Sequence, residues 1–227
     1  GPEKTRQFEA ALTDLQPNTR YFYAVYDEDE RLTPKDESYY FDTLPEFGTD
    51  KDAYFWVVGD SGTGQERQSE VHEAMLDYTK KVGRPIDFYL HVGDMAYSKG
   101  TDDQFQRKFF EMYEETIRNT VVWPAIGNHE AASAPAKTGT GPYYDAYVCP
   151  KKGEAGGVAS GHESYYSFDY GKAHFVVLNS FDMDRKVDGA MASWLKEDLS
   201  RVKADWLVGY WHHPPYSKGT HDTDKEE

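Results

Sequence analysis

Three short apolar runs, each followed at once by glycine and an acidic or amide residue, most restrict how this chain folds. The runs cover residues 54–58, 86–92 and 121–126, and they lead into Gly59-Asp60, Gly93-Asp94 and Gly127-Asn128. Short continuous apolar runs are typical of strands covered on both faces of a sheet. The turns at the carboxyl ends of such strands are where α/β folds place their sites. We therefore expect these polar side chains to gather at one edge of a sheet.

The segments between and after these runs predict the remaining elements. Residues 66–82 and 103–117 predict helices, the first with Val71, Met75, Leu76 and Tyr78 facing inward. A strand–helix–strand–helix–strand order implies right-handed crossovers and a largely parallel sheet. Farther along we expect an insertion loop over 131–161, a hairpin over 164–180 turning at Gly171-Lys172, a helix over 190–202 and a strand over 206–211.

The first 46 residues predict β structure of a different kind. Strands are expected at 20–26 and 39–45, with a third at Gln7 to Leu12. Three strands cannot cover both faces of a sheet, so further strands are expected before Gly1. The pattern over 15–25 and 41–45 resembles the last half of a fibronectin type III-like domain. We divide the chain into residues 1–46, part of that all-β domain, and residues 47–227.

Charge and composition exclude several classes of function. The chain has 25 Lys and Arg against 40 Asp and Glu, a net charge of −15. That argues against a nucleic-acid partner or an anionic membrane surface, but not against a phosphorylated substrate, because metal ions reverse the local sign. There is no membrane span, since no run of 18 apolar residues occurs. The single cysteine, Cys149, excludes an internal disulfide, and a free thiol is favoured over a link between two chains.

The strand ends bring together side chains that bind metal ions. Asp60, Asp94 and Asn128 carry hard oxygen donors, and a fourth strand end at His212-His213 adds imidazole. Taken singly, each motif has a simpler interpretation: Gly-Asp as an ordinary turn, Asn128 as a helix N-cap, and the histidine pair before two prolines as a packed loop end. Taken in this order, the set favours a metal site.

These motifs also carry a resemblance to a known family. Those at Gly59-Asp60-Ser61-Gly62, Gly93-Asp94-Met95-Ala96-Tyr97, Gly127-Asn128-His129-Glu130 and Tyr210-Trp211-His212 resemble, over residues 54–216, the purple acid phosphatase branch of the calcineurin-like metallophosphoesterases. The resemblance implies an α/β fold, a metallophosphoesterase β-sandwich flanked by helices, truncated here at its C-terminus. The fibronectin-like pattern agrees with it, since such a domain precedes the catalytic one in that branch.

The resemblance implies a dinuclear metal centre. Asp60, Asp94 and Tyr97 would bind the first ion, and Asp94 would bridge to a second ion bound by Asn128 and His212. Gly62 stands where the wider family has a histidine ligand, and a Tyr97 phenolate would replace it, which favours a hard trivalent ion. The implied pair is Fe(III) with a divalent Fe, Zn or Mn. His212 is preferred to His213 because the family pattern is His-x-Pro-x-Tyr.

The implied activity is hydrolysis of phosphate monoesters, in which a metal-bound hydroxide attacks phosphorus. His129 and His221 would contact the substrate, and a protonated His129 predicts an acidic optimum. A phosphodiesterase or nucleotidase using the same site remains open, as does a non-catalytic surface-binding protein with a vestigial site. The natural substrate and the oligomeric state stay open too.

One departure from the family bears on activity. The family's fifth motif, Gly-His-x-His, supplies one histidine to each metal, and none follows His212; Gly161-His162-Glu163 lacks the second histidine. We expect a fragment of a secreted or extracytoplasmic phosphatase, inactive if nothing follows Glu227. Of the other histidines, His91 and His174 are expected to be structural and His72 exposed.

Overall fold

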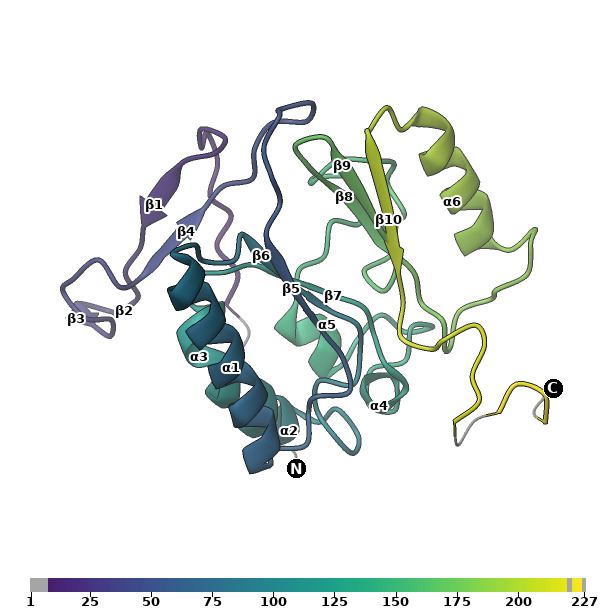
Figure 1. Cartoon of the computed structure of the whole chain (residues 1–227), viewed down its shortest axis with the longest axis horizontal. Coiled ribbons are helices and arrows are strands. Elements are labelled where there is room, and N and C mark those ends of the chain that lie inside the picture. Colours follow the sequence, from purple (N-terminus) through teal and green to yellow (C-terminus); the bar gives the residue numbers. More distant parts are fainter. Residues whose placement is uncertain (1–7, 220–221, 226–227) are drawn as a thin grey trace.

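Two three-stranded sheets form the centre of the protein. The computed structural model describes residues 8–219 and 222–225. The first sheet has the order β5-β6-β7 and is wholly parallel, and the second has the order β10-β9-β8, with β9 parallel to β10 and antiparallel to β8 (Figure 1). Their bounds are β5 Phe55–Val58, β6 Phe88–His91, β7 Val122–Pro124, β8 Tyr166–Tyr170, β9 Ala173–Val177 and β10 Trp206–Tyr210. The predicted parallel strands and the hairpin are confirmed.

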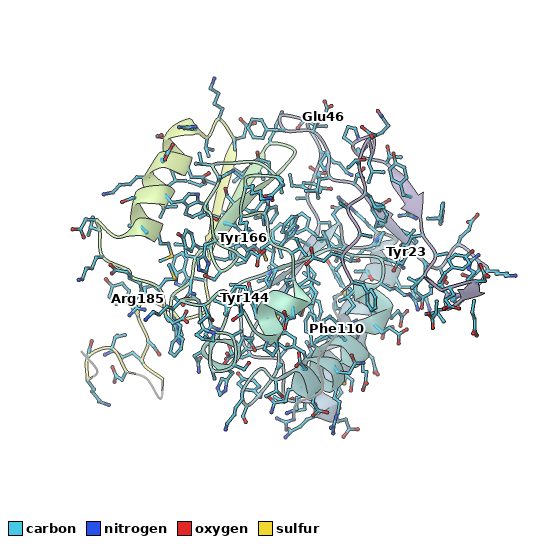
Figure 2. The ribbon with its side chains drawn as sticks, turned by 180° about the vertical axis from the view of Figure 1, so that it is seen from behind. Tyr23, Glu46, Phe110, Tyr144, Tyr166 and Arg185 are labelled. Atoms are coloured by element: carbon cyan, nitrogen blue, oxygen red, sulfur yellow. The ribbon has the colours of Figure 1, made fainter. Side chains whose placement is uncertain are left out.

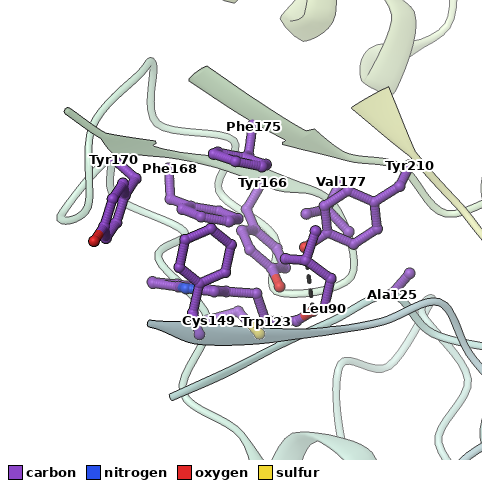
Figure 3. Packing of buried hydrophobic residues seen from close by; sticks show 11 residues of the cluster. Leu90, Trp123, Ala125, Cys149, Tyr166, Phe168, Tyr170, Phe175, Val177 and Tyr210 are labelled. Atoms are coloured by element: carbon purple, nitrogen blue, oxygen red, sulfur yellow. Dashed lines mark hydrogen bonds between the residues drawn. The ribbon is translucent and has the colours of Figure 1, made fainter. Parts of the chain in front are cut away.

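The space between the two sheets is filled largely by aromatic rings. Successive residues of a strand point to opposite faces, so Phe88 and Leu90 of β6 enter this core while Tyr89 points to the helices. Trp123 stacks on Phe168 at 4.1 Å between ring centroids (Figure 3). Burying one such side chain stabilises the fold by roughly 1.5–3 kcal/mol. The shared core holds the two sheets face to face as a sandwich.

Helices cover the outer faces of the sandwich (Figure 1). Residues of the α2–α3 stretch pack on the β5-β6-β7 sheet with Tyr89, and Met191 and Trp194 of α6 pack on the other sheet with Val176. The predicted helix at 103–117 is α2, a π-helical segment η1, and α3 in succession, and the predicted insertion loop contains α5. The bounds are α1 Glu66–Val82, α2 Asp102–Phe105, η1 Gln106–Phe110, α3 Glu111–Ile117, α4 Asn128–Ala131, α5 Pro142–Ala146 and α6 Ala190–Arg201.

Helix α1 faces the core partly as expected, since Met75 and Leu76 are half-buried. Val71 and Tyr78 are 52% and 57% exposed, so their predicted inward position is wrong. The buried residues are instead Gln68 and His72. Gln68 donates to the carbonyl of Lys108 at 2.6 Å, and the His72 ring lies 2.7 Å from Thr116 Oγ1. The prediction that His72 is exposed is also wrong, because a search for apolar residues overlooks polar ones that find buried partners.

The N-terminal segment contains two separate strand pairs. Strand β1 (Arg20–Phe22) pairs antiparallel with β4 (Tyr40–Asp42), and β2 (Tyr26–Asp27) pairs with β3 (Glu30–Arg31). The expected strand from Gln7 to Leu12 is wrong over residues 8–12, which are exposed and form no ladder; Gln7 lies outside the described residues. The fibronectin-like assignment and the boundary after residue 46 stay predictions.

Two hydrogen bonds tie this segment to the end of α3. The Tyr23 hydroxyl donates to the carbonyl of Arg118 at 2.7 Å, and the amide of Tyr40 donates to Asn119 Oδ1 at 3.0 Å. In the view from behind, Tyr23 lies beside the N-terminal strands, whereas Tyr166 lies in the middle of the protein (Figure 2). Tyr23 and Tyr40 thus fix the first strand pair against the sandwich.

Two further predictions concern the whole chain. In the described part of the chain, no helix has both the length and the apolar character needed to cross a membrane.

Cys149 is a free cysteine, 3% exposed, and burial raises the pKa of its thiol to about 12. This burial agrees with the expected free thiol, because a buried, protonated thiol is poorly placed to react.

Candidate metal centre

The loops after β5, β6, β7 and β10 meet at one edge of the sandwich. The amide of Asp60 donates to the carbonyl of Gly93 at 3.0 Å, which joins the first two loops. The His212 imidazole, from the loop after β10, reaches the carbonyl of Val92 at 2.9 Å. Parallel strands carry these loops to the same edge, as the sequence predicted.

The five predicted metal ligands lie together at this edge. One ligand atom each from Asp60, Asp94 and His212 lies within 4.8 Å of the others. His212 Nε2 is 3.1 Å from Asn128 Oδ1, and the Tyr97 hydroxyl donates to Asp60 Oδ1 at 2.9 Å. Carboxylate, amide, phenol and imidazole groups therefore converge in one place.

Two glycines make this convergence possible. Gly93 has φ +98°, and a Cβ there would overlap the His212 ring. Gly62 donates its amide to the carbonyl of Asp94 at 3.1 Å, and a Cβ there would overlap the backbone of Met95. No side chain fits at position 62, so a histidine there would require a different path for these loops. The side chain that lies next to Asp60 is that of Tyr97, whose hydroxyl donates to the Asp60 carboxylate.

Both aspartates hold unusual backbone conformations. Asp60 and Asp94 have φ of +53° and +58°, in the left-handed region that costs most residues free energy. Such conformations cluster at functional sites, where the surroundings impose them. Here they turn each carboxylate out of its strand toward the other loops.

His212 and Asp94 form a buried pair. Their side chains are 6% and 4% exposed, and His212 Nε2 lies 3.4 Å from Asp94 Oδ2. Burial alone would lower the pKa of His212 and raise that of Asp94, but their mutual hydrogen bond and charge outweigh it, so the His212 pKa is raised and the Asp94 pKa is lowered. The Nδ1–H of His212 donates to the Val92 carbonyl, which turns Nε2 toward Asp94.

Burial, the hydrogen bond to Asp60 and the charge of Asp94 raise the pKa of Tyr97 well above its ordinary value. Its phenol is therefore protonated when no cation is present. A cation that binds the phenolate must displace this proton, so binding there releases a proton.

His129 lies beside these ligands without joining them. Its Nδ1–H donates to the carbonyl of Ser98 at 2.6 Å, and its Nε2 lies 3.7 Å from Asp94 Oδ2. The ring meets Tyr97 edge-on, with 4.6 Å between centroids, and the side chain is 32% exposed. Nε2 is thus the nitrogen that faces the centre. His221, the other predicted substrate contact, lies outside the described residues.

Glu130 is a site residue that the sequence did not single out. Its carboxylate is 0% exposed and accepts hydrogen bonds from the amides of Asp94, Ala96 and Gly127 at 2.8, 3.1 and 3.1 Å. One side chain therefore clamps the loop after β6 to the loop after β7. The signal was present: a glutamate three residues after Gly127 has the capping-box spacing.

His91, at the end of β6, contacts the two loops that carry Asp60 and Asp94. It is fully buried, accepts from the amide of Gly93 at 3.2 Å, and meets Ser61 Oγ at 2.9 Å. Burial, with the charge of His212, lowers the pKa of His91 to about 3, so the ring is neutral. The prediction that His91 and His174 are structural agrees with their positions, since His174 lies between two aspartates in the second sheet.

Comparison with known proteins identifies the family. Residues 53–227 match the model of the calcineurin-like phosphoesterases. The chain belongs to the calcineurin-like phosphoesterase family. The four motifs lie within the matched residues, so the resemblance that they carry is confirmed at the level of the family.

Curated relatives of this phosphoesterase are plant purple acid phosphatases. Purple acid phosphatase 23 of Arabidopsis thaliana is 29% identical over 91% of this chain and 48% of its own length. Purple acid phosphatase 21 is 31% identical, over 89% of this chain and 42% of its own. Another relative, 28% identical over 92% of this chain and 36% of its own, is named probable inactive purple acid phosphatase 9. The chain spans less than half the length of these relatives.

A solved structure supports the fold. Purple acid phosphatase PPD1 from yellow lupin (Lupinus luteus) seeds matches 95% of this chain and 40% of its own with a TM-score of 0.72, at 19% sequence identity. At that identity the likeness concerns the fold alone. The predicted mixed α/β metallophosphoesterase fold is confirmed by it.

The donor set of this phosphoesterase fits metal ions. Two carboxylates, an amide oxygen and a phenol provide hard oxygen ligands, and an imidazole adds one nitrogen. Asp94 has a ligand atom within 4.8 Å of those of Asp60 and His212, and its Oδ2 lies 3.4 Å from His212 Nε2. The side chains present therefore suit metal ions.

Proposed function

We propose that this protein hydrolyses phosphate monoesters at a dinuclear metal centre. The observation that carries the proposal is the convergence of Asp60, Asp94 and His212 ligand atoms within 4.8 Å, with Asn128 and Tyr97 hydrogen-bonded to members of the set. Asp60, Asp94 and Tyr97 would hold one ion, and Asp94, Asn128 and His212 the other. When bound, the ions neutralise phosphate oxygens and lower the pKa of water.

The protein's own part is to position these groups. Glu130 and the Val92 carbonyl fix Asp94 and His212 before any substrate arrives. Fixed ligands of this kind reduce the reorganisation needed as charge develops on the reacting phosphate. Asp60 is exposed, so the centre is open to a substrate from solution.

His129 is the proposed acid for the leaving oxygen. Its Nδ1–H is already used by the Ser98 carbonyl, so Nε2 can donate a proton only from the imidazolium form. Protonation of the leaving oxygen by such a group is general acid catalysis, which uses the protonated form of the side chain. This supports an acidic optimum; a full-length protein whose activity peaks above pH 8 would contradict it.

A non-catalytic role is the second candidate. It is favoured by one observation: a relative named probable inactive purple acid phosphatase 9 is 28% identical over 92% of this chain, close to the 29% over 91% of purple acid phosphatase 23. In this role the protein would bind metal ions without cleaving a phosphate ester.

The deciding experiment compares p-nitrophenyl phosphate with bis-p-nitrophenyl phosphate on the full-length protein, alongside Asp94→Asn. A monoesterase cleaves the first substrate faster, and Asp94→Asn abolishes the cleavage. Faster cleavage of the bis ester would favour the phosphodiesterase alternative. Binding of two metal ions without cleavage of either ester would favour the non-catalytic alternative.

Two finer features belong to the same proposal. An Fe(III) ion bound to the Tyr97 phenolate would give a visible charge-transfer band that Tyr97→Phe removes, and a divalent Fe, Zn or Mn would occupy the second position.

A secreted phosphatase would be released from cells, and immunodetection in the culture medium tests this release.

A further inference from the structure

His213 lies beside His212, one of the predicted metal ligands. It follows His212 directly, and the two rings meet edge-on with 4.6 Å between centroids. His213 is half-buried, so solvent and ligands reach part of the ring.

Two contacts with Ser180 fix the orientation of the His213 ring. Ser180 follows β9, and its Oγ accepts from the backbone amide of His213 at 3.0 Å and lies 2.9 Å from ring Nδ1. With one lone pair occupied by the amide, the hydroxyl proton is available to Nδ1, the acceptor it reaches among the described residues. Nδ1 then accepts, and the ring proton resides on Nε2.

The loop that carries Ser180 is itself held in place. Arg185 donates from Nη1 to the carbonyls of Ser180 and Phe181 at 3.0 and 2.6 Å. Phe181 stacks on the His213 ring with 5.8 Å between centroids. The ring is therefore fixed on one face and at Nδ1, while no residue of the described chain hydrogen-bonds its Nε2–H.

We propose that His213 donates its Nε2–H to an oxygen of a phosphate group bound at the metal centre, and that Ser180 positions it for this role. The inference rests on the proposed function, since it needs a phosphate at the centre. An oriented N–H beside an anion site strengthens binding, because hydrogen bonds to charged groups exceed those between neutral ones. His129 and His213 would then contact the same phosphate group from different loops.

The test uses the zinc-loaded full-length protein and calorimetric titration with inorganic phosphate, which requires no turnover. His213→Gln places its amide Nε2 the same number of bonds from Cα as the ring nitrogen, whereas His213→Leu has no donor. We expect His213→Leu to weaken phosphate binding about tenfold or more. His213→Gln should stay within about threefold of wild type, and Ser180→Ala should fall between the two.

Two controls separate a contact from a structural role. Zinc affinity should be unchanged in both His213 variants, and His162→Gln, a histidine bonded to the Ala136 carbonyl, should change neither affinity. His213→Leu with wild-type phosphate affinity would overturn the inference. Equal losses in His213→Gln and His213→Leu with weakened zinc binding would overturn it as well, since they indicate damage to the centre.

The test of this inference and the test of the proposed function can fail separately. A wild-type protein that binds zinc and phosphate but cleaves no ester would refute the hydrolase, while the affinities of the His213 variants still decide this inference. A wild-type protein that binds zinc but no phosphate would refute the inference itself.

Discussion

Two clusters in this protein combine histidine with aspartate, but the two serve different purposes. At the strand ends, His212 meets Asp94 and lies near Asp60. In the second sheet, His174 lies between Asp169 and Asp198, with 2.6 Å from Nδ1 to one carboxylate and 2.8 Å from Nε2 to the other. Both histidines have a raised pKa, yet only the first cluster is placed to bind a ligand.

The difference lies in how completely each cluster is satisfied. Each His174 nitrogen has its own carboxylate, and Asp198 also accepts from Ser167 Oγ at 3.0 Å and from the amide of Val158 at 2.6 Å. At the strand ends, Asp60 is exposed and several ligand atoms face one another. A histidine between carboxylates is therefore structural when its partners enclose it, and a metal site when they leave room between them.

Removing His174 should cost the most stability. His174→Phe leaves Asp198, which is 0% exposed, as an uncompensated buried charge, and breaking a buried pair costs about 3–5 kcal/mol. Urea denaturation should show this loss, with zinc affinity unchanged. A variant as stable as wild type would mean that the second cluster does not hold the fold together.

The same cluster predicts a pH dependence. Burial lowers the His174 pKa, but hydrogen bonds and charges from Asp169 and Asp198 outweigh it and raise the pKa to about 9. The stabilisation is complete below the ordinary histidine value of about 6.5 and is lost as pH rises through 9, a change of about 3 kcal/mol. Zinc binding runs the other way, because it needs unprotonated His212. Unfolding measured from pH 6 to 10, with and without zinc, separates the two clusters.

Asp94→Asn should weaken the metal centre with little effect on the second cluster. Losing a carboxylate shared by two ions should reduce zinc affinity on the order of 100-fold or more, beyond what the loss of an outer partner causes. Asp169→Asn is the matched control, expected to lower stability and leave zinc affinity unchanged. Equal effects of the two variants on zinc binding would erase the distinction between the clusters.

Glu130→Gln should give a smaller loss at the same centre. The Gln amide would place an N–H against one of the three backbone amides that the carboxylate accepts, loosening the loops that carry Asp94 and Asn128. Groups that orient metal ligands are worth about 10–100-fold in affinity. Glu163→Gln, which removes the charge that pairs with Lys151, serves as control in the same zinc titration. Unchanged affinity in Glu130→Gln would show that the clamp is dispensable.

Most of the candidate centre was predictable because its signals are local. Asp60, Asp94 and Asn128 follow strands that their apolar runs reveal, and parallel strands bring their ends to one edge. Glu130 and the buried His72 escaped prediction because their roles depend on partners far along the chain, Asp94 and Thr116. The inward positions expected of Val71 and Tyr78 on α1 were misjudged for the same reason.

The sequence by itself determined the order of the strands along the chain, the glycines at the turns and the types of ligand. These follow from periodicity and backbone freedom over a few residues. Only the tertiary structure decided which of the two histidine–aspartate clusters is enclosed and which is open. It also decided that Gly62 has no room for a side chain and that Ser180 and Phe181 hold the His213 ring beside His212. These outcomes depend on contacts between separate segments, such as His213 with Ser180 and Gly62 with Met95, which no local pattern records.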